Sequence, residues 1–207
     1  MQYANSIGIG KWSRISFAAL SCAAVTACAS VQTDQTSPPS NTSANWAVDY
    51  GASDIRFAGT YSGQAFNGTF DNWRADITWY PEALDASSVS VEVDTGRIAI
   101  EDKSHGETLK APEWFNIGAF PSATVNLDNF EERNGKLEGE AKVTVKNTSA
   151  VVPFTFNIIY DGDRATMTGA TTLERSRLGL GQESDPAGDW VSNEISVTVR
   201  VEAVRSR

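Results

Sequence analysis

Strict alternation of apolar and polar residues is the strongest constraint on the fold of this chain. In KLEGEAKVTVK, residues 136–146, one face carries Leu137, Gly139, Ala141, Val143 and Val145, and the other face is mostly lysine and glutamate. Because successive side chains of a β-strand point to opposite faces, this pattern predicts a strand with one buried face. Residues 194–204, EISVTVRVEAV, repeat the pattern and predict a second such strand.

Six further segments have a similar alternation, at residues 54–61, 64–80, 88–94, 123–130, 151–159 and 164–173. Within 64–80 the apolar phase shifts near Asp71–Asn72, which predicts a bulge or a sharp bend. Pro153 lies on the face opposite to its apolar neighbours. Since proline cannot donate to a β-ladder, we expect it near an edge or a bulge.

Short turn sequences such as RNGK and YDGDR join these segments, so neighbouring strands should pair as antiparallel hairpins. Eight such strands either stack as two sheets or close into a barrel, and closure removes the exposed edges. A transmembrane barrel has the same alternation with its apolar face outward. Gly139, Ala141 and Gly169 suit lipid contact poorly, so we predict an all-β, eight-stranded antiparallel barrel with an apolar interior and one short helical segment near residues 106–115.

The N-terminal residues are typical of an export signal. Lys11 and Arg14 precede a short apolar run, residues 15–27, and the run ends in VTAC, which resembles the lipobox of bacterial lipoproteins. We therefore expect a signal peptide at 1–27, lipidation at Cys28, a flexible tether at 28–45 and the barrel domain at 46–207. Cys22 is a weaker lipidation candidate, and an ordinary cleaved signal is the alternative. Ala29 favours the outer membrane, facing the periplasm, by resemblance to Gram-negative sorting rules.

Composition excludes several classes of site. Both cysteines lie in or beside the signal, so we expect neither disulfides nor thiolate chemistry in the domain. The single histidine makes a zinc site improbable, and no metal or cofactor is predicted. The formal net charge of −9 argues against nucleic acid as a partner and against binding anionic lipid through a basic patch.

His105 is the only histidine, in the segment KSHGETLKAPEWFNIGAFPSA, residues 103–123. A catalytic base needs a nucleophile or a substrate proton within hydrogen-bond reach, yet the sequence has no G-x-S-x-G motif. We interpret EDKSHGET as a polar loop with a solvated histidine, and we predict no enzyme activity. An enzyme that uses His105 is retained as an alternative.

The aromatic residues are numerous for one domain and alternate with small residues on the predicted strands, among them Gly59, Gly68, Gly139 and Gly169. This mixture suggests an elongated apolar channel that holds one ligand, as pockets of this kind are lined mainly by hydrophobic side chains. A fully packed core in a structural envelope module is the alternative. The predicted ligand-binding residues are Phe57, Phe66, Phe70, Trp73, Ile77, Val125, Val143, Phe154, Phe156 and Met167.

The domain resembles the YceI-like family of periplasmic, lipocalin-like, polyisoprenoid-binding proteins. The similarity begins with WAVDYGASDIRFAG at Trp46, continues through LKAPEWFNIGAFPSATV, and includes TTLERSRLGLG with Arg175 and Gly179. Leu178 departs from the family, which usually has an aromatic residue there. Asn147 also departs, replacing a glycine in the turn at residues 143–149.

The resemblance implies a barrel that holds an isoprenoid chain, such as a quinone tail, or another long-chain amphiphile. We therefore expect an apolar lipid as ligand, the membrane as a partner through the N-terminal anchor, and no nucleic acid. The sequence leaves the oligomeric state undecided, with a homodimer as one alternative. A stress-protective factor that acts on such lipids is a further alternative function. We interpret Leu109, Trp114, Phe115, Phe120 and Pro121 as a short helix and aromatic plug that closes or gates one end.

Overall fold

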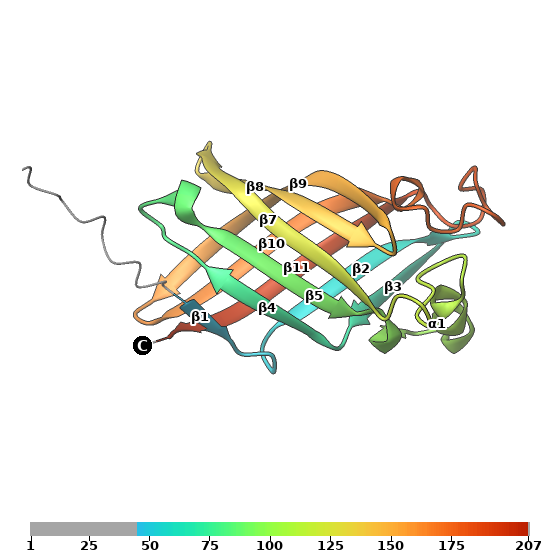
Figure 1. Cartoon of the computed structure of the whole chain (residues 1–207), viewed down its shortest axis with the longest axis horizontal. Helices are drawn as coiled ribbons and strands as arrows, with labels where there is room; N and C mark the ends of the chain where they lie inside the picture. Colours follow the sequence, from blue (N-terminus) through green and yellow to red (C-terminus); the bar gives the residue numbers. More distant parts are fainter. Residues whose placement is uncertain (1–44, 207) are drawn as a thin grey trace, which may run out of the picture. The chain divides into compact units, whose positions relative to one another are not determined.

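The computed structural model describes residues 45–206. The predicted signal, Cys28 and the tether up to residue 44 lie outside the described residues. One α-helix and eleven strand segments follow in chain order (Figure 1). The strands are β1 Asn45–Val48, β2 Asp54–Tyr61, β3 Gln64–Phe70, β4 Trp73–Thr78, β5 Ser88–Asp94, β6 Ile98–Ile100, β7 Ser122–Arg133, β8 Lys136–Val145, β9 Thr148–Asp161, β10 Arg164–Glu174 and β11 Glu194–Arg205. The helices are α1 Lys103–Lys110 and the 3-10 turns η1 Leu84–Ala86, η2 Thr95–Arg97 and η3 Arg175–Leu178.

The strands form a closed eight-stranded antiparallel barrel, as predicted. The ring order is β1-β4-β5-β7-β8-β9-β10-β11, and β1 closes it by pairing with β11. At the α1 end, β2 pairs with β11 and β3, and β3 pairs with β6. The pairs β1 and β2, β3 and β4, and β5 and β6 therefore act as three long strands, each interrupted once, which reconciles eleven segments with eight barrel strands.

Both predicted irregularities lie where the sequence indicated. β3 ends at Phe70 and β4 begins at Trp73, so the phase shift corresponds to a break at Asp71–Asn72. Pro153 pairs with Glu140 of β8, whereas the ladder between β9 and β10 ends at Thr155. The missing N–H of Pro153 therefore removes no hydrogen bond from the β10 side.

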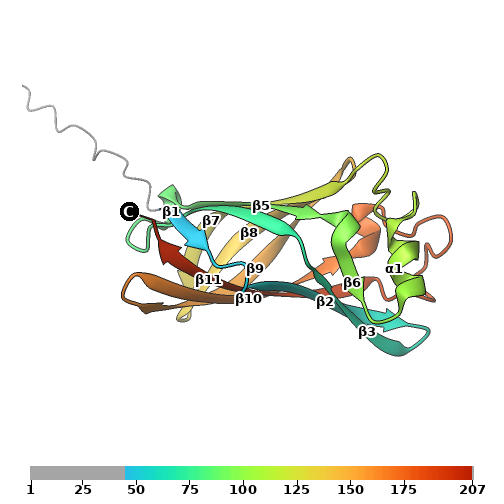
Figure 2. The same ribbon diagram turned by 90° about the horizontal axis from the view of Figure 1, so that it is seen from below.

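The predicted apolar face points inward. Along β8, Gly139, Ala141, Val143 and Val145 are buried and alternate with outward residues. Figure 2 shows the barrel from a second side, with α1 beside the end formed by β2, β3 and β6. Within residues 45–206 no helix is long and apolar enough to span a membrane.

The predicted helix exists, but it begins three residues earlier than expected. α1 starts at Lys103, because the Asp102 carboxylate accepts a hydrogen bond from the Ser104 N–H and caps the helix. The interpretation of EDKSHGET as a loop was therefore wrong. Pro112 follows the C-terminal end of α1, and residues 112–115 form a turn instead of continuing the helix.

Candidate functional site

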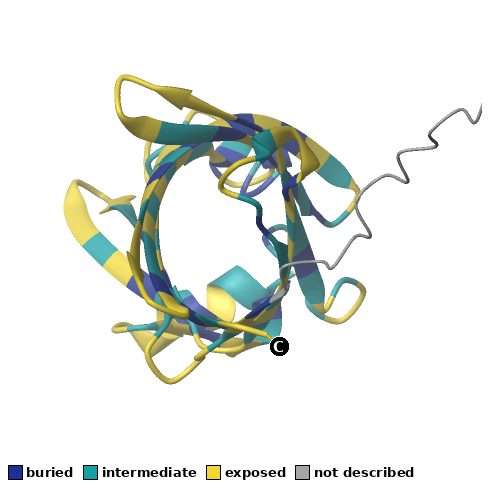
Figure 3. Ribbon diagram, turned by 90° about the vertical axis from the view of Figure 1, so that its left-hand side faces the viewer, coloured by how far each residue is buried: buried dark blue, intermediate teal, exposed yellow. Residues whose placement is uncertain are grey.

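An apolar cavity of about 280 Å³ lies inside the barrel. Figure 3 looks along the barrel from the end opposite α1 and shows the strands as a closed ring around this space. All ten residues predicted to contact a ligand line the cavity. They are Phe57 from β2, Phe66 and Phe70 from β3, Trp73 and Ile77 from β4, Val125 from β7, Val143 from β8, Phe154 and Phe156 from β9, and Met167 from β10.

Burial along β11 locates the open part of the interior. Val201 and Ala203, near one end, are buried, whereas Ile195, Val197 and Val199 on the same face are only partly buried. All five line the cavity, so the surface that the middle residues retain faces the internal space. The barrel is therefore packed near the end that holds Val201 and Ala203, and it is hollow along the middle of β11.

The strand glycines do not create this space, which corrects the prediction of a channel beside them. A Cβ on Gly169 would lie 2.3 Å from the Phe154 ring, and one on Gly139 would lie 2.7 Å from the Phe130 ring. A Cβ on Gly68 would lie 2.4 Å from the Phe57 ring, whereas one on Gly59 would lie 2.8 Å from both the Ile195 and Ser192 side chains and 2.9 Å from the Phe66 ring. Gly68, Gly139 and Gly169 each have an aromatic ring from a neighbouring strand against them, so side chains occupy the room that these small residues provide.

The α1 end is covered by two segments, α1 with the loop after it and the loop between η3 and β11 (Figure 1). Leu109, Trp114 and Phe115 line the cavity there, as predicted for a plug. Phe120 and Pro121 do not line it, which corrects that part of the prediction. Their carbonyl oxygens instead accept hydrogen bonds from the fully buried Thr95 hydroxyl, at 3.3 and 3.0 Å.

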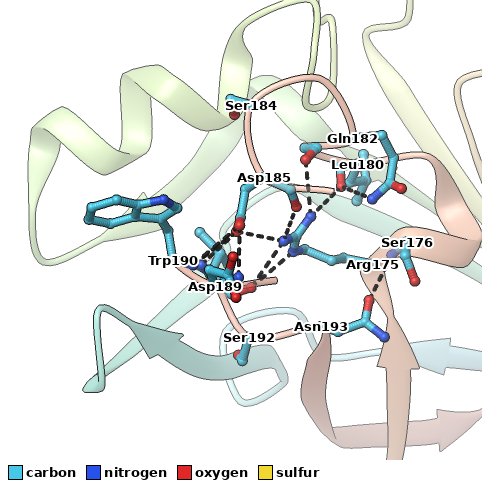
Figure 4. Close-up of polar contacts among 12 residues, drawn as sticks. Arg175, Ser176, Leu180, Gln182, Ser184, Asp185, Asp189, Trp190, Ser192 and Asn193 are labelled. Carbon is cyan, nitrogen blue, oxygen red and sulfur yellow. Dashed lines mark hydrogen bonds and ion pairs between the residues drawn. The ribbon is translucent and has the colours of Figure 1, made fainter. Parts of the chain in front are cut away.

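Arg175 holds the second segment in place (Figure 4). Its guanidinium is buried and donates to the Asp185 carboxylate at 2.7 Å. It also lies 5.5 Å from the ring centre of Trp114, which connects it to the first segment. Its remaining hydrogen bonds are to backbone carbonyl oxygens, namely those of Leu180, Gly181, Asp185 and Val191. Although Arg175 lines the cavity, every one of its donor nitrogens has an acceptor within the protein.

The acidic partners of this region are strongly hydrogen-bonded. The Val191 N–H lowers the pKa of Asp185 below its ordinary value of 3.8, and the Trp190 and Asp189 N–H groups and the Arg175 charge act in the same direction, against the effect of burial. The Ser184 N–H and hydroxyl likewise lower the pKa of Glu113 from 4.5. Glu113 therefore ties the loop after α1 to the loop after η3.

The opposite end is filled by aromatic side chains. Trp79 packs edge-on against Phe130 and Phe156, with ring centres 5.2 and 5.7 Å apart. Its indole N–H donates to the Tyr160 hydroxyl at 2.7 Å. Trp46 lies 6.0 Å from the Tyr160 ring, and both tryptophans line the cavity.

His105 lies outside the cavity lining. It belongs to α1, its ring centre is 4.7 Å from that of Tyr61, and its Nδ1 is 4.0 Å from the Asp102 carboxylate. The neighbouring Ser104 hydroxyl donates to Asp102 at 2.6 Å and not to the histidine, so His105 does not activate this serine as a nucleophile. In the part of the chain that the structure describes, no three His, Cys, Asp or Glu side chains gather as metal ligands would.

Comparison with known proteins agrees with this architecture. The profile of the YceI-like domain matches residues 46–203. The chain belongs to the YceI-like family. A UPF0312 protein of Shewanella sp. (strain W3-18-1) is 23% identical over 145 residues, which cover 67% of this chain and 74% of the relative.

Two solved structures share the fold. Burkholderia cenocepacia BcnA superposes with a TM-score of 0.71 at 20% identity, covering 76% of this chain and 99% of BcnA. A polyisoprenoid binding domain from Saccharophagus degradans, implicated in plant cell wall breakdown, has a TM-score of 0.61 at 12% identity and covers 79% of this chain and 99% of that domain. At these identities the similarity establishes the fold.

Sequence reasoning missed part of the cavity wall and the polar network beside it. Val89, Val91 and Leu173 line the cavity and continue the predicted apolar phase of their strands, so the alternation alone could have identified them. Arg175 was noticed only through the family resemblance, and no local pattern indicated that Asp185 would be its partner.

Proposed function

We propose that this YceI-like protein binds one long-chain amphiphile, an isoprenoid or a similar lipid, inside the barrel. The observation that carries the proposal is the cavity: among its lining residues only Thr171 and Arg175 are not hydrophobic. Both are already satisfied, since the Thr171 hydroxyl donates to the Pro153 carbonyl at 2.7 Å and Arg175 donates within its own network. The name of the Saccharophagus domain supports the same ligand class.

Burial of hydrocarbon supplies the driving force. Each methylene removed from water contributes about 0.8 kcal/mol, so a tail of roughly ten carbons gains about 8 kcal/mol before the entropy costs of association. The volume of about 280 Å³ is close to the lower limit of small-molecule sites, roughly 300 Å³. A single slender chain suits it better than a bulky fused ring system.

The test is organic extraction of protein purified from its native host without detergent, followed by mass spectrometry. We expect one isoprenoid or fatty-chain lipid per protein molecule. Protein that carries no lipid, and that binds none when lipids are added, would contradict the proposal and favour a purely structural module.

A matched pair of variants locates the lipid. Val125 faces the cavity, whereas its neighbour Asn126 is exposed on the outer face. Val125→Phe should fill part of the cavity and reduce the extracted lipid severalfold, while Asn126→Phe should leave it unchanged. Equal lipid content in both variants would show that the lipid lies elsewhere.

We further propose that the protein is exported, lipidated at Cys28 and held at the outer membrane facing the periplasm. The VTAC sequence and Ala29 support this assignment. Mass spectrometry of the mature N-terminus should detect a diacylglyceryl group on Cys28, and Cys28→Ser should release the protein from the membrane fraction. Sedimentation analysis of the same preparation decides between a monomer and a homodimer.

A further inference from the structure

The two segments that cover the α1 end, residues 103–121 and 179–193 and here named the α1 cover, are joined by hydrogen bonds within the protein. The Lys146 ammonium group bridges them, because it donates to the Glu113 carbonyl oxygen of the first segment at 3.3 Å and to the Gly179 carbonyl oxygen of the second at 3.2 Å. Together with the hydrogen bonds of the Glu113 carboxylate, this bridge makes the α1 cover a single braced unit.

Trp114 has little freedom inside the α1 cover. The residue is 7% exposed, and the Arg175 guanidinium lies 5.5 Å from its ring centre. A Cβ on Gly181 would lie 2.7 Å from the Trp114 ring, so this ring lies directly against the second segment. The Gly181 N–H in turn donates to the Glu113 carbonyl oxygen at 3.3 Å. The indole is therefore held by both segments.

Leu109 and Phe115 carry the α1 cover to the cavity. Both side chains line the cavity and are only partly buried. The Phe115 N–H donates to the Leu109 carbonyl oxygen at 2.9 Å, which fixes the turn between them. The Phe115 ring also packs edge-on against Phe70 of β3, with ring centres 6.3 Å apart. A chain that extends toward α1 inside the barrel therefore meets side chains whose backbone cannot retreat without breaking hydrogen bonds.

The hollow part of the barrel is bounded at its other end by packed side chains. Val201 and Ala203 are buried there. The rings of Trp79, Phe130 and Phe156 pack against one another at the same end. A methylene group occupies about the volume of a water molecule in the liquid, roughly 30 Å³, so the cavity of about 280 Å³ holds roughly nine to ten carbons. A longer tail must displace close-packed side chains or remain in water, so its extra carbons add little affinity.

We propose that Leu109 and Phe115, held by the α1 cover, form a fixed stop that limits the buried tail of the ligand to roughly ten carbons. The inference rests on the proposed lipid-binding function and deepens it, because it assigns the length of tail that the barrel selects. Affinity should therefore rise with chain length up to this limit and then level off.

The test measures the affinity of saturated straight-chain fatty acids, from about six to sixteen carbons, for the delipidated full chain by calorimetry below their micelle concentrations. Up to the limit, each added methylene should raise the association constant about fourfold, the factor that corresponds to burial of one methylene group. Beyond roughly ten carbons, each should raise it less than about 1.5-fold. A fourfold gain that continues to the longest acid would overturn the stop.

Two substitutions at Leu109 should move the limit in opposite directions. Leu109→Ala shortens the side chain of the stop, so the limit should rise by about two carbons, because the protein closes only part of such a cavity. Leu109→Phe enlarges the same side chain, so the limit should fall by about two carbons. Leu84→Ala is the matched control, because Leu84 belongs to η1 and does not line the cavity, and its limit should equal that of the wild type.

The position of the limit separates the stop from a merely structural role of Leu109. A substitution that only destabilises the protein would lower the affinity of every acid by a similar factor and leave the limiting length unchanged. A limit that is the same in the wild type and in both Leu109 variants would overturn the stop and leave the lipid-binding function standing. Failure of the wild type to bind any of the acids would overturn both.

Discussion

Replacement of Arg175 by methionine tests how the α1 end of the barrel is held together. The substitution keeps the length of an apolar stem but removes a guanidinium that serves four backbone carbonyl groups and one carboxylate. Breaking a buried ion pair by removing one partner typically costs about 3–5 kcal/mol, because the remaining charge stays buried without compensation. For a domain of this size, a loss of about 3–5 kcal/mol lowers the melting temperature by roughly 6–20 °C.

The assay is urea unfolding followed by tryptophan fluorescence and far-UV circular dichroism. The variant should keep the wild-type m-value, the slope of the free energy of unfolding against urea concentration, so that the shift in midpoint reports stability alone. Arg175→Lys should also be destabilised, since an ammonium group cannot reproduce the planar set of donors. The control is Arg177→Met, because the Arg177 side chain is 52% exposed and its guanidinium lies 3.9 Å from the Glu174 carboxylate. The free energy of unfolding of this variant should stay within about 0.5 kcal/mol of the wild-type value. A loss below about 1 kcal/mol for Arg175→Met, or wild-type stability for Arg175→Lys, would refute the reasoning.

Two further predictions concern pH and packing. Because the folded state depresses the pKa of Asp185 and Glu113, their contribution to stability is complete above their ordinary pKa values of 3.8 and 4.5 and is lost as the pH falls through the lower folded values. The urea unfolding midpoint, measured between pH 7 and pH 2.5, should therefore fall as the solution becomes acidic. The midpoint of Glu113→Gln should depend less steeply on pH than that of the wild type. An equally steep dependence in the variant would contradict the assignment to Glu113. Gly169→Ala should cost about 1–3 kcal/mol, because the new Cβ would lie 2.3 Å from Phe154, whereas Ala170→Ser on the outer face should be nearly neutral in the same measurement.

The barrel could be predicted because its determinants are local. Each strand carries its own inward and outward pattern, and short turns between strands leave antiparallel pairing as the simplest arrangement. The same logic identified the break at Asp71–Asn72 and the tolerance for Pro153. The start of α1 was missed because capping depends on one side chain, Asp102, in a segment whose composition is equally typical of a loop.

The wall of the cavity could be predicted for the same reason, since the strand phase decides which side chains face inward. The distribution of space inside could not. Gly139 and Gly169 appear as vacant positions in the sequence, yet rings from Phe130 and Phe154 lie against them. Which ring covers which glycine depends on register between strands and on side-chain rotamers, and neither is encoded in a single segment.

The two ends of the barrel are closed by different kinds of interaction, and this difference bears on how a ligand enters. To open the α1 end, the protein must break the Arg175–Asp185 pair and the hydrogen bonds of Glu113 with Ser184, all between protein groups. At the opposite end, the one side-chain hydrogen bond that the described aromatic residues make runs from the Trp79 indole N–H to the Tyr160 hydroxyl. Trp46, Phe130 and Phe156 make none to a described residue, and rotamer changes move such rings without breaking the β-ladder. Local opening follows the least costly set of contacts, so ligand exchange is favoured at the aromatic end and a gate at α1 is disfavoured.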